Sequence, residues 1–374
     1  MKAWPPAGFI PAGSFMALDD GVSVAERDNH HFVPQFYFRC FSTDGRSICL
    51  LNRATGALVR QASIRGQASK SKFYGSQEVE KALGDLEGTC SAALRALLQS
   101  RNPAALDDKA IMLVLTWLTL QRSRTIAARH ASKPMHDKLL RLYLEMTLAQ
   151  DTSLSEEERA ALQGSFNEVE SNPVRDQLMQ MQVAMQSADV LADLQPVLLV
   201  NRTNRPFIFS DAPVVFYNCL YRKVKLRGVL GADTPGLIVL FPLGPELLLI
   251  LCDHACYELR RLRNHQIQIR DHRDVRALNK LQIHSAAACV YFHDSQFSNY
   301  VAELWREERP SLTRRVATVV EAPGFDADTR EPLGEIMHSF EPQLPFALEL
   351  SFMKHQVLGD TEYQFQRRSD RHRA

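Results

Sequence analysis

The chain changes its hydrophobic pattern twice, and this order limits the fold class more than any other feature. β-Branched and aromatic runs fill residues 32–64, apolar residues at helical spacing follow over about 76–195, and strand-like runs return from residue 197. Strands, then helices, then strands predict an α+β fold. A lone N-terminal hairpin is too small to be stable, so we expect it to join a C-terminal mixed sheet, with the central multi-helix block packed on it.

The first strand block carries a hairpin signal. Apolar runs cover residues 36–41, 47–51 and 58–64, and a short linker ending in Gly56 joins the last two. Glycine readily adopts the left-handed backbone conformation that tight turns need. We therefore predict extended structure at these runs, with Gly56 at a left-handed turn position.

The central block predicts five helices from apolar spacing and end signals. They are expected at residues 78–98, at 106–130 after a cap at Asp107 or Asp108, at 133–148, after the Ser155/Glu158 capping box, and from Pro173 towards Pro196.

The second strand block contains two runs that are apolar throughout, which favours strands buried on both faces. Strands are predicted at residues 197–200, 207–209, 214–217, 237–241, 247–251 and 290–293, and helices at 275–288 and 300–309. These signals predict one α+β domain at residues 29–299. The Pro/Gly-rich residues 1–28 are expected to form a flexible arm and residues 300–374 a C-terminal extension. The extension ends in a basic tail, which we interpret as a solvated end rather than an arm that contacts nucleic acid; its arginines are Arg367, Arg368, Arg371 and Arg373.

Charge and cysteine usage bound the class of protein. The 44 Lys and Arg nearly balance the 43 Asp and Glu, so the chain has no overall positive charge that would favour binding to nucleic acid or to an anionic membrane. The composition is still compatible with a local basic patch. The 7 cysteines are odd in number and sit mostly in apolar runs, as reduced thiols do. Proline and glycine interrupt the apolar stretches, which argues against a signal peptide or a membrane span. We expect a soluble, cytoplasmic protein.

The adjacent histidines His30 and His31 open an apolar, aromatic segment that also contains Tyr37. In an extended segment, neighbouring side chains point to opposite faces. Imidazole can act as acid, base or metal ligand near neutral pH, so His30 and His31 are candidate catalytic residues and Tyr37 a candidate substrate contact. The alternative is one buried structural histidine and one surface histidine.

A second polar signal lies within the predicted helix at 106–130. Gln121 and Arg124 extend the face that Trp117 occupies. An arginine on an apolar face must be paired or must serve an anionic ligand, because an unpaired buried charge is costly. Arg124 is therefore a candidate catalytic residue and Gln121 a substrate contact, with a structural ion pair of Arg124 as the alternative.

Ser210 and Asp211 form a polar dyad between two strand-like runs. Pro213 favours an extended conformation at the residue before it, which fixes where the Asp211 carboxylate emerges. Asp211 could orient a histidine or bind a metal, and Ser210 and Asn279 are candidate substrate contacts; the alternative is a turn capped by Asp211. The sequence at 252–256, Cys-Asp-His-Ala-Cys, lacks the second ligand pair of a zinc site, so we predict core thiols and no metal site. Cofactor and oligomeric state stay open.

The order of these motifs resembles one family. The motifs are HHFVPQFYFRCF at 30–41, SKFYG at 71–75, QRSRT at 121–125, PFIFSDAPVV at 206–215, FPLGPELLLIL at 241–251 and LNK at 278–280. The chain resembles an uncharacterised bacterial family of unknown function that opens with HHxVPxFYLRxF and later carries SDxPV and PLxP. It differs at Phe38, Ala212 and Gly244, where leucine, asparagine and serine are common. The resemblance spans roughly residues 29–295 and implies no settled activity.

Two functions are compatible with these residues. The first is a hydrolase or nuclease-like effector of bacterial antiphage defence, acting on nucleic acid or a phosphorylated small molecule. In it His30 or His31 would be the acid or base, Asp211 would orient it, and Arg124 would stabilise phosphate charge. The second is a non-catalytic sensor or interaction protein in which the same cluster is structural or binds a ligand. Convergence of these side chains in one reachable cleft would distinguish them.

Overall fold

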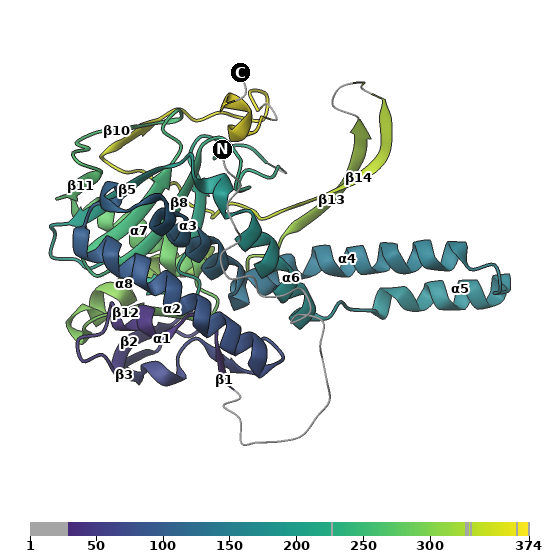
Figure 1. The fold of residues 1–374 in the computed structure, drawn as a ribbon, viewed down its shortest axis with the longest axis horizontal. Coiled ribbons are helices and arrows are strands. Elements are labelled where there is room, and N and C mark those ends of the chain that lie inside the picture. The colour runs from purple at the N-terminus through teal and green to yellow at the C-terminus, as the bar shows by residue number, and fades with distance from the viewer. Residues whose placement is uncertain (1–28, 226, 326–328, 330, 364–365, 373–374) are drawn as a thin grey trace.

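The structure is a computed structural model that describes residues 29–225, 227–325, 329, 331–363 and 366–372. The arm predicted at residues 1–28 lies outside this range. Figure 1 shows two projections from a body of sheets and helices. One is the pair of helices α4 (Ile126–Gln150) and α5 (Glu156–Ser165). The other is the two-stranded ribbon of β13 (Thr318–Phe325) and β14 (Pro332–Phe340).

The larger sheet has five strands in the order β11-β5-β9-β8-β7. Their bounds are β5 (Gln195–Asn201), β7 (Val215–Asn218), β8 (Leu237–Gly244), β9 (Leu247–Cys252) and β11 (Gln266–Ile269). β11 runs parallel to β5 and the remaining pairs are antiparallel, so the sheet is mixed. Every residue of β8 and β9 is buried, which confirms the prediction of strands covered on both faces.

The smaller sheet joins the N-terminal hairpin to strands that follow the helical block. Its order is β3-β2-β12-β6, with all pairs antiparallel. Its strands are β2 (Ser47–Asn52), β3 (Leu58–Ser63), β6 (Phe209–Ser210) and β12 (Cys289–Phe292). Gly56 has φ +75°, which confirms its left-handed turn position. The α+β prediction and the pairing of the hairpin with later strands are confirmed.

The helical block departs from the prediction in one place. α2 (Gln77–Ser100) and α3 (Asp108–Ser123) lie where expected, and Asp107 caps α3 by accepting from the backbone N–H of Ala110. The predicted bounds 106–130 and 133–148 are wrong, because the chain breaks at Arg124 and restarts as α4, which continues through residues 131–132 without a break. The cause is Thr125, whose extended backbone and side-chain oxygen, 3.1 Å from the N of Ala128, form a new N-cap.

The remaining helices follow their end signals. The predicted capping box is present, since the backbone N–H of Ser155 donates to Glu158 and that of Glu158 donates back to Ser155. The other helices are α6 (Pro173–Gln186), α7 (His272–Ser285) and α8 (Ser298–Glu308). No helix in the described ranges combines the length and the apolar content that crossing a bilayer requires.

The extended run predicted at 36–41 is wrong. It forms a short helix, α1 (Gln35–Arg39), which starts after Pro34. One helical turn places Tyr37, Phe38 and Phe41 against both sheets, where their rings contact Phe209, Phe241 and Tyr291. Aromatic residues favour strands in isolation, but burial of three rings in one cluster outweighs that preference.

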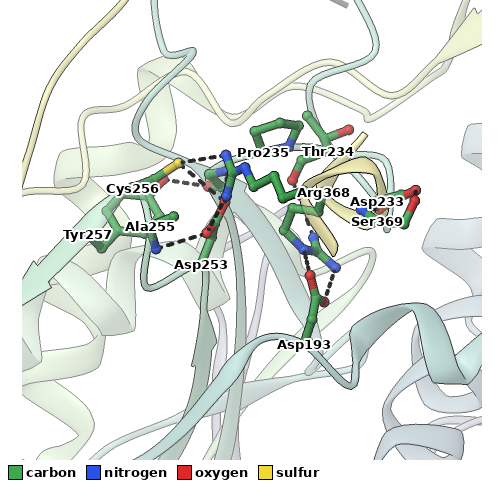
Figure 2. Close-up of polar contacts among 12 residues, drawn as sticks. Asp193, Asp233, Thr234, Pro235, Asp253, Ala255, Cys256, Tyr257, Arg368 and Ser369 are labelled. Atoms are coloured by element: carbon green, nitrogen blue, oxygen red, sulfur yellow. Dashed lines mark hydrogen bonds and ion pairs between the residues drawn. The ribbon is translucent and has the colours of Figure 1, made fainter. Parts of the chain in front are cut away.

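The C-terminal segment packs on the domain. β15 (Met353–His355) pairs with β10 (Tyr257–Leu259). The prediction of a solvated tail is wrong for Arg368, which is 1% exposed. Figure 2 shows its guanidinium at the Asp193 carboxylate. Arg368 donates to both carboxylate oxygens, each at 2.8 Å, and so the charge of the buried arginine is paired. Arg373 lies outside the described residues.

The turn at 252–256 holds the same tail. Arg371 donates to the Asp253 carboxylate at 2.9 Å. The Cys256 thiol donates to the same carboxylate at 3.2 Å (Figure 2). Burial raises the pKa of Cys252 to about 12 and that of Cys256 to about 11, so both thiols stay protonated at neutral pH. Cys252 is buried as predicted, but Cys256 is only partly buried. In the described ranges no group of three or more His, Cys, Asp or Glu could hold a metal ion.

Candidate functional site

The histidine pair lies in β1 (Asn29–His31), which pairs with β4 (Ser69–Ser71). His30 is 1% exposed, its Nδ1 accepts from the backbone N–H of Tyr74 at 3.0 Å, and its ring stacks on the Tyr74 ring. His31 is partly exposed, and its Nε2 lies 3.1 Å from the carbonyl oxygen of Arg65. The two rings therefore occupy different environments, as expected for neighbours in a strand.

Arg124 lies at the break between α3 and α4 and is completely buried. Its guanidinium donates to Glu87 at 2.6 Å, to the Tyr74 hydroxyl at 3.0 Å, and to the backbone carbonyl of His31 at 2.6 Å. Burial alone would lower the pKa of Arg124, but Tyr74 and Glu87 outweigh it and raise the pKa above its usual value. Arg124 thus stays charged and ties β1 to α2.

Gln121 and Tyr37 are also engaged with backbone groups. Gln121 donates to the carbonyl of Phe32 at 2.9 Å, and the Tyr37 hydroxyl donates to the carbonyl of Pro242 at 2.5 Å. Both side chains are buried. These two hydrogen bonds therefore connect the opening motif, residues 30–41, to α3 and β8.

Ser210, Asp211 and Asn279 belong to a second cluster between β6 and α7. The Ser210 hydroxyl donates to Gln282 at 3.0 Å, and Asn279 accepts from the backbone N–H of Ile208 at 3.1 Å. Asp211 accepts from three consecutive backbone N–H groups that follow α7; the donors are Ala287 and Ala288, both at 2.7 Å, and Cys289 at 3.2 Å. Burial raises the pKa of Asp211 to about 6, against these donors, which favour the ionised form.

The predicted residues therefore fall into two groups with different partners. His31 and Arg124 meet at β1, whereas Asp211 is bound to the turn after α7. The ion pair of Arg124 with Glu87 supplies the structural alternative considered for that arginine. Catalytic roles for these residues, and a role in antiphage defence, stay predictions.

A pocket of about 300 Å³ lies beside the second cluster. Four segments line it: the β2–β3 turn, the start of α4, the end of α7 and the residues before β13. We call it the arginine pocket; its lining residues are Arg53, Ala127, His130, His284, Ser285, Ala286, Ala287, Thr313, Arg314 and Arg315. No aspartate or glutamate belongs to the described lining. The lining contains three arginines.

Backbone contacts hold Arg53 in place. Its guanidinium donates to the carbonyl of Ile283 at 3.3 Å and to that of Thr313 at 2.8 Å. Burial lowers its pKa, and Asp211 opposes this shift. An arginine remains protonated in proteins, so Arg53 brings a full positive charge to the pocket.

Arg315 enters the pocket from the segment before β13 and shares one carboxylate with a second arginine. Arg122 and Arg315 both contact Glu341. Burial would raise the pKa of Glu341, but the two guanidinium groups outweigh it and lower the pKa, so this trio carries a net positive charge. The Nε of Arg315 is buried and has no hydrogen-bond partner within the described ranges.

Two imidazoles complete the pocket. His130 has its pKa lowered by burial and by the nearby charges of Arg314, Arg129 and Lys70. His284 is bound through Nε2 to the Glu308 carboxylate at 2.8 Å, yet burial still lowers its pKa. Both rings therefore favour the neutral form, which can accept a proton near neutral pH.

Residues 29–296 match the model of a family described as a protein of unknown function (DUF4238). The chain belongs to the DUF4238 family. Neither the curated proteins nor the solved structures gave a match to it. The matched range confirms the resemblance to a family of unknown function drawn from the sequence motifs.

The DUF4238 region contains most of the arginine pocket but not all of it. Arg53, His130 and His284 lie inside the matched range, whereas Arg314 and Arg315 follow it. Sequence reasoning missed this pocket, because its members come from four distant segments. The one usable signal was the Arg314–Arg315 pair placed directly before an apolar, strand-like run.

Proposed function

We propose that this DUF4238 protein binds a phosphorylated ligand in the arginine pocket. The observation that carries the proposal is the charge of the lining, which has three arginines and no carboxylate among its described residues. Three positive charges on one lining favour a bound anion, which would compensate them. The planar N–H fork of arginine also matches the oxygen atoms of a phosphate group.

The start of α4 adds to this preference. Ala127 lies in the first turn of α4 and lines the pocket. A helix N-terminus carries a partial positive charge and presents free N–H groups, which favour anions. The N-terminus of α4 and the arginines thus both contribute a positive electrostatic potential to the arginine pocket.

Hydrolysis of the bound phosphate ester is the second candidate function. It is favoured by His130 and His284, two imidazoles that line the same pocket and whose pKa values are lowered. A neutral imidazole could take a proton from an attacking water while the arginines stabilise charge on the phosphate. The chemistry would then use other histidines than the His30–His31 pair.

Calorimetric titration of the full chain with inorganic phosphate and pyrophosphate tests binding. The test variant is R314A, because Arg314 is exposed and its loss spares the fold; the matched control is R270A, an exposed arginine outside the pocket lining. We expect R314A to weaken phosphate binding about tenfold, as loss of one charge-assisted contact does, and R270A to match wild type. Equal affinities of wild type, R314A and R270A, or no binding by wild type, would overturn the proposal.

Hydrolysis is tested separately with H130A and a generic phosphate ester such as p-nitrophenyl phosphate. Turnover by wild type and its loss in H130A, with phosphate affinity retained, would support the enzyme. Binding without turnover would leave the protein a phosphate-binding module and reject the hydrolase.

A further inference from the structure

A second pocket of about 180 Å³ adjoins the arginine pocket and shares Ala127, Ser285 and Arg315 with it. We call it the side pocket. Its other lining residues are Arg122, Thr125, Ala128, Ala131, Ser132, Met135, Gln180, Ala212, Val214, Ala317, Ser339, Phe340 and Glu341. The arginine pocket alone, at about 300 Å³, reaches the lower end of the range of about 300–1,000 Å³ typical of small-molecule sites, and the side pocket lies next to it.

The side pocket differs in chemistry from its neighbour. Met135, Val214 and Phe340 give it an apolar, partly aromatic wall. Its Glu341 carboxylate is already engaged by Arg122 and Arg315, so it adds no free negative charge. Two arginines and one glutamate make this lining less positive than that of the arginine pocket, which has three arginines and no carboxylate, so a phosphate is expected in the arginine pocket first.

Gln180 supplies a directional contact. It lines the side pocket from α6, and its Oε1 is buried without a hydrogen-bond partner within the described part of the chain. An unpaired buried carbonyl costs free energy unless a ligand donates to it. The ligand therefore needs an N–H or O–H donor on the part that enters this pocket.

We infer that the ligand is a nucleoside monophosphate, with its phosphate in the arginine pocket and its base in the side pocket. This inference rests on the proposed phosphate binding. A nucleobase offers a flat face for Phe340 and an N–H group for Gln180, whereas a plain sugar phosphate offers no aromatic face. The balanced charge of the whole chain, 44 basic and 43 acidic residues, favours a mononucleotide over a long nucleic-acid strand.

The test is calorimetric titration of the full chain with inorganic phosphate, ribose 5-phosphate, AMP, GMP, CMP and UMP. We expect at least one monophosphate to bind about tenfold more tightly than ribose 5-phosphate, a factor that stacking on one aromatic ring supplies. Q180M should reduce this margin about fivefold, as loss of one hydrogen bond does, and leave the affinity for inorganic phosphate unchanged. Q186M is the matched control, since Gln186 is exposed on the same helix.

Each outcome separates the inference from the proposal on which it rests. If inorganic phosphate and ribose 5-phosphate bind but no base adds affinity, the nucleotide inference is overturned and phosphate binding stands. If a single-stranded oligonucleotide binds more tightly than every mononucleotide, the pocket serves nucleic acid and the inference also fails. If none of these probes binds, both proposals fall. If Q180M does not change the difference in affinity between the monophosphate and ribose 5-phosphate, Gln180 does not contact the base.

Discussion

Replacement of Arg124 by methionine tests whether this arginine stabilises the fold through its contacts with the opening motif and α2. Methionine keeps much of the apolar stem of arginine and removes the guanidinium. The variant R124M would lose the ion pair with Glu87 and the hydrogen bonds to the Tyr74 hydroxyl and the His31 carbonyl. All three contacts connect segments far apart in the sequence, so their loss should weaken the whole domain.

The size of the loss follows from burial. Arg124 is 0% exposed and Glu87 is 20% exposed, so water can rehydrate Glu87 in part but cannot replace the donors to His31. Breaking a fully buried pair costs about 3–5 kcal/mol, and an exposed pair is worth about 0–1 kcal/mol. Partial hydration of Glu87 places R124M near the lower end of the first range, at a loss of about 3 kcal/mol.

Urea unfolding of wild type and R124M, followed by circular dichroism, measures this loss. R95M is the matched control, because Arg95 is exposed on α2, and its free energy of unfolding should stay within about 0.5 kcal/mol of wild type. The slopes of the two transitions must agree for the comparison to hold. If R124M lowers the free energy of unfolding by less than about 1 kcal/mol, a structural role of Arg124 is refuted and the alternative of an arginine that binds an anionic ligand is favoured.

Three further substitutions have defined outcomes. G56A should destabilise by about 2 kcal/mol more than G45A in thermal unfolding, since both glycines have positive φ but only at Gly56 would the new methyl overlap a tryptophan ring; equal losses would contradict this. R368A should release the tail to limited proteolysis while R367A resists like wild type, because only Arg368 is buried. The raised pKa of Asp211, about 6, means that the folded state holds a proton that the unfolded state releases near pH 4. Wild-type stability should therefore fall relative to D211N as pH rises from about 4 to 6, and parallel curves in denaturant titrations would rule out this linkage.

Much of the fold was readable from local signals. The left-handed glycine at position 56, the cap at Asp107 and the capping box at Ser155 each depend on a few adjacent residues. The uniformly apolar runs of β8 and β9 predicted buried strands for the same reason. These features satisfy backbone groups or bury side chains within one element, so sequence proximity is enough to reveal them.

The candidate site was predicted only in part. Arg124 was singled out as a group that needs a partner, because burying its charge otherwise is costly, and Asp211 was singled out as a turn cap or a carboxylate for a histidine or metal. Which partners they find was not encoded locally. Arg124 binds Glu87 and Asp211 binds the turn after α7, so the two do not share one set of contacts.

The sequence by itself determined the α+β class, most element positions and the requirement that its buried charges be paired. Tertiary structure alone decided that residues 35–39 form a helix and that the tail docks through Arg368. It also decided that two distant segments bring their arginines to one pocket, which α4 and α7 complete. The physical reason is that ring packing, ion pairing and charge crowding depend on separations in space, which the spacing of residues along a chain does not fix.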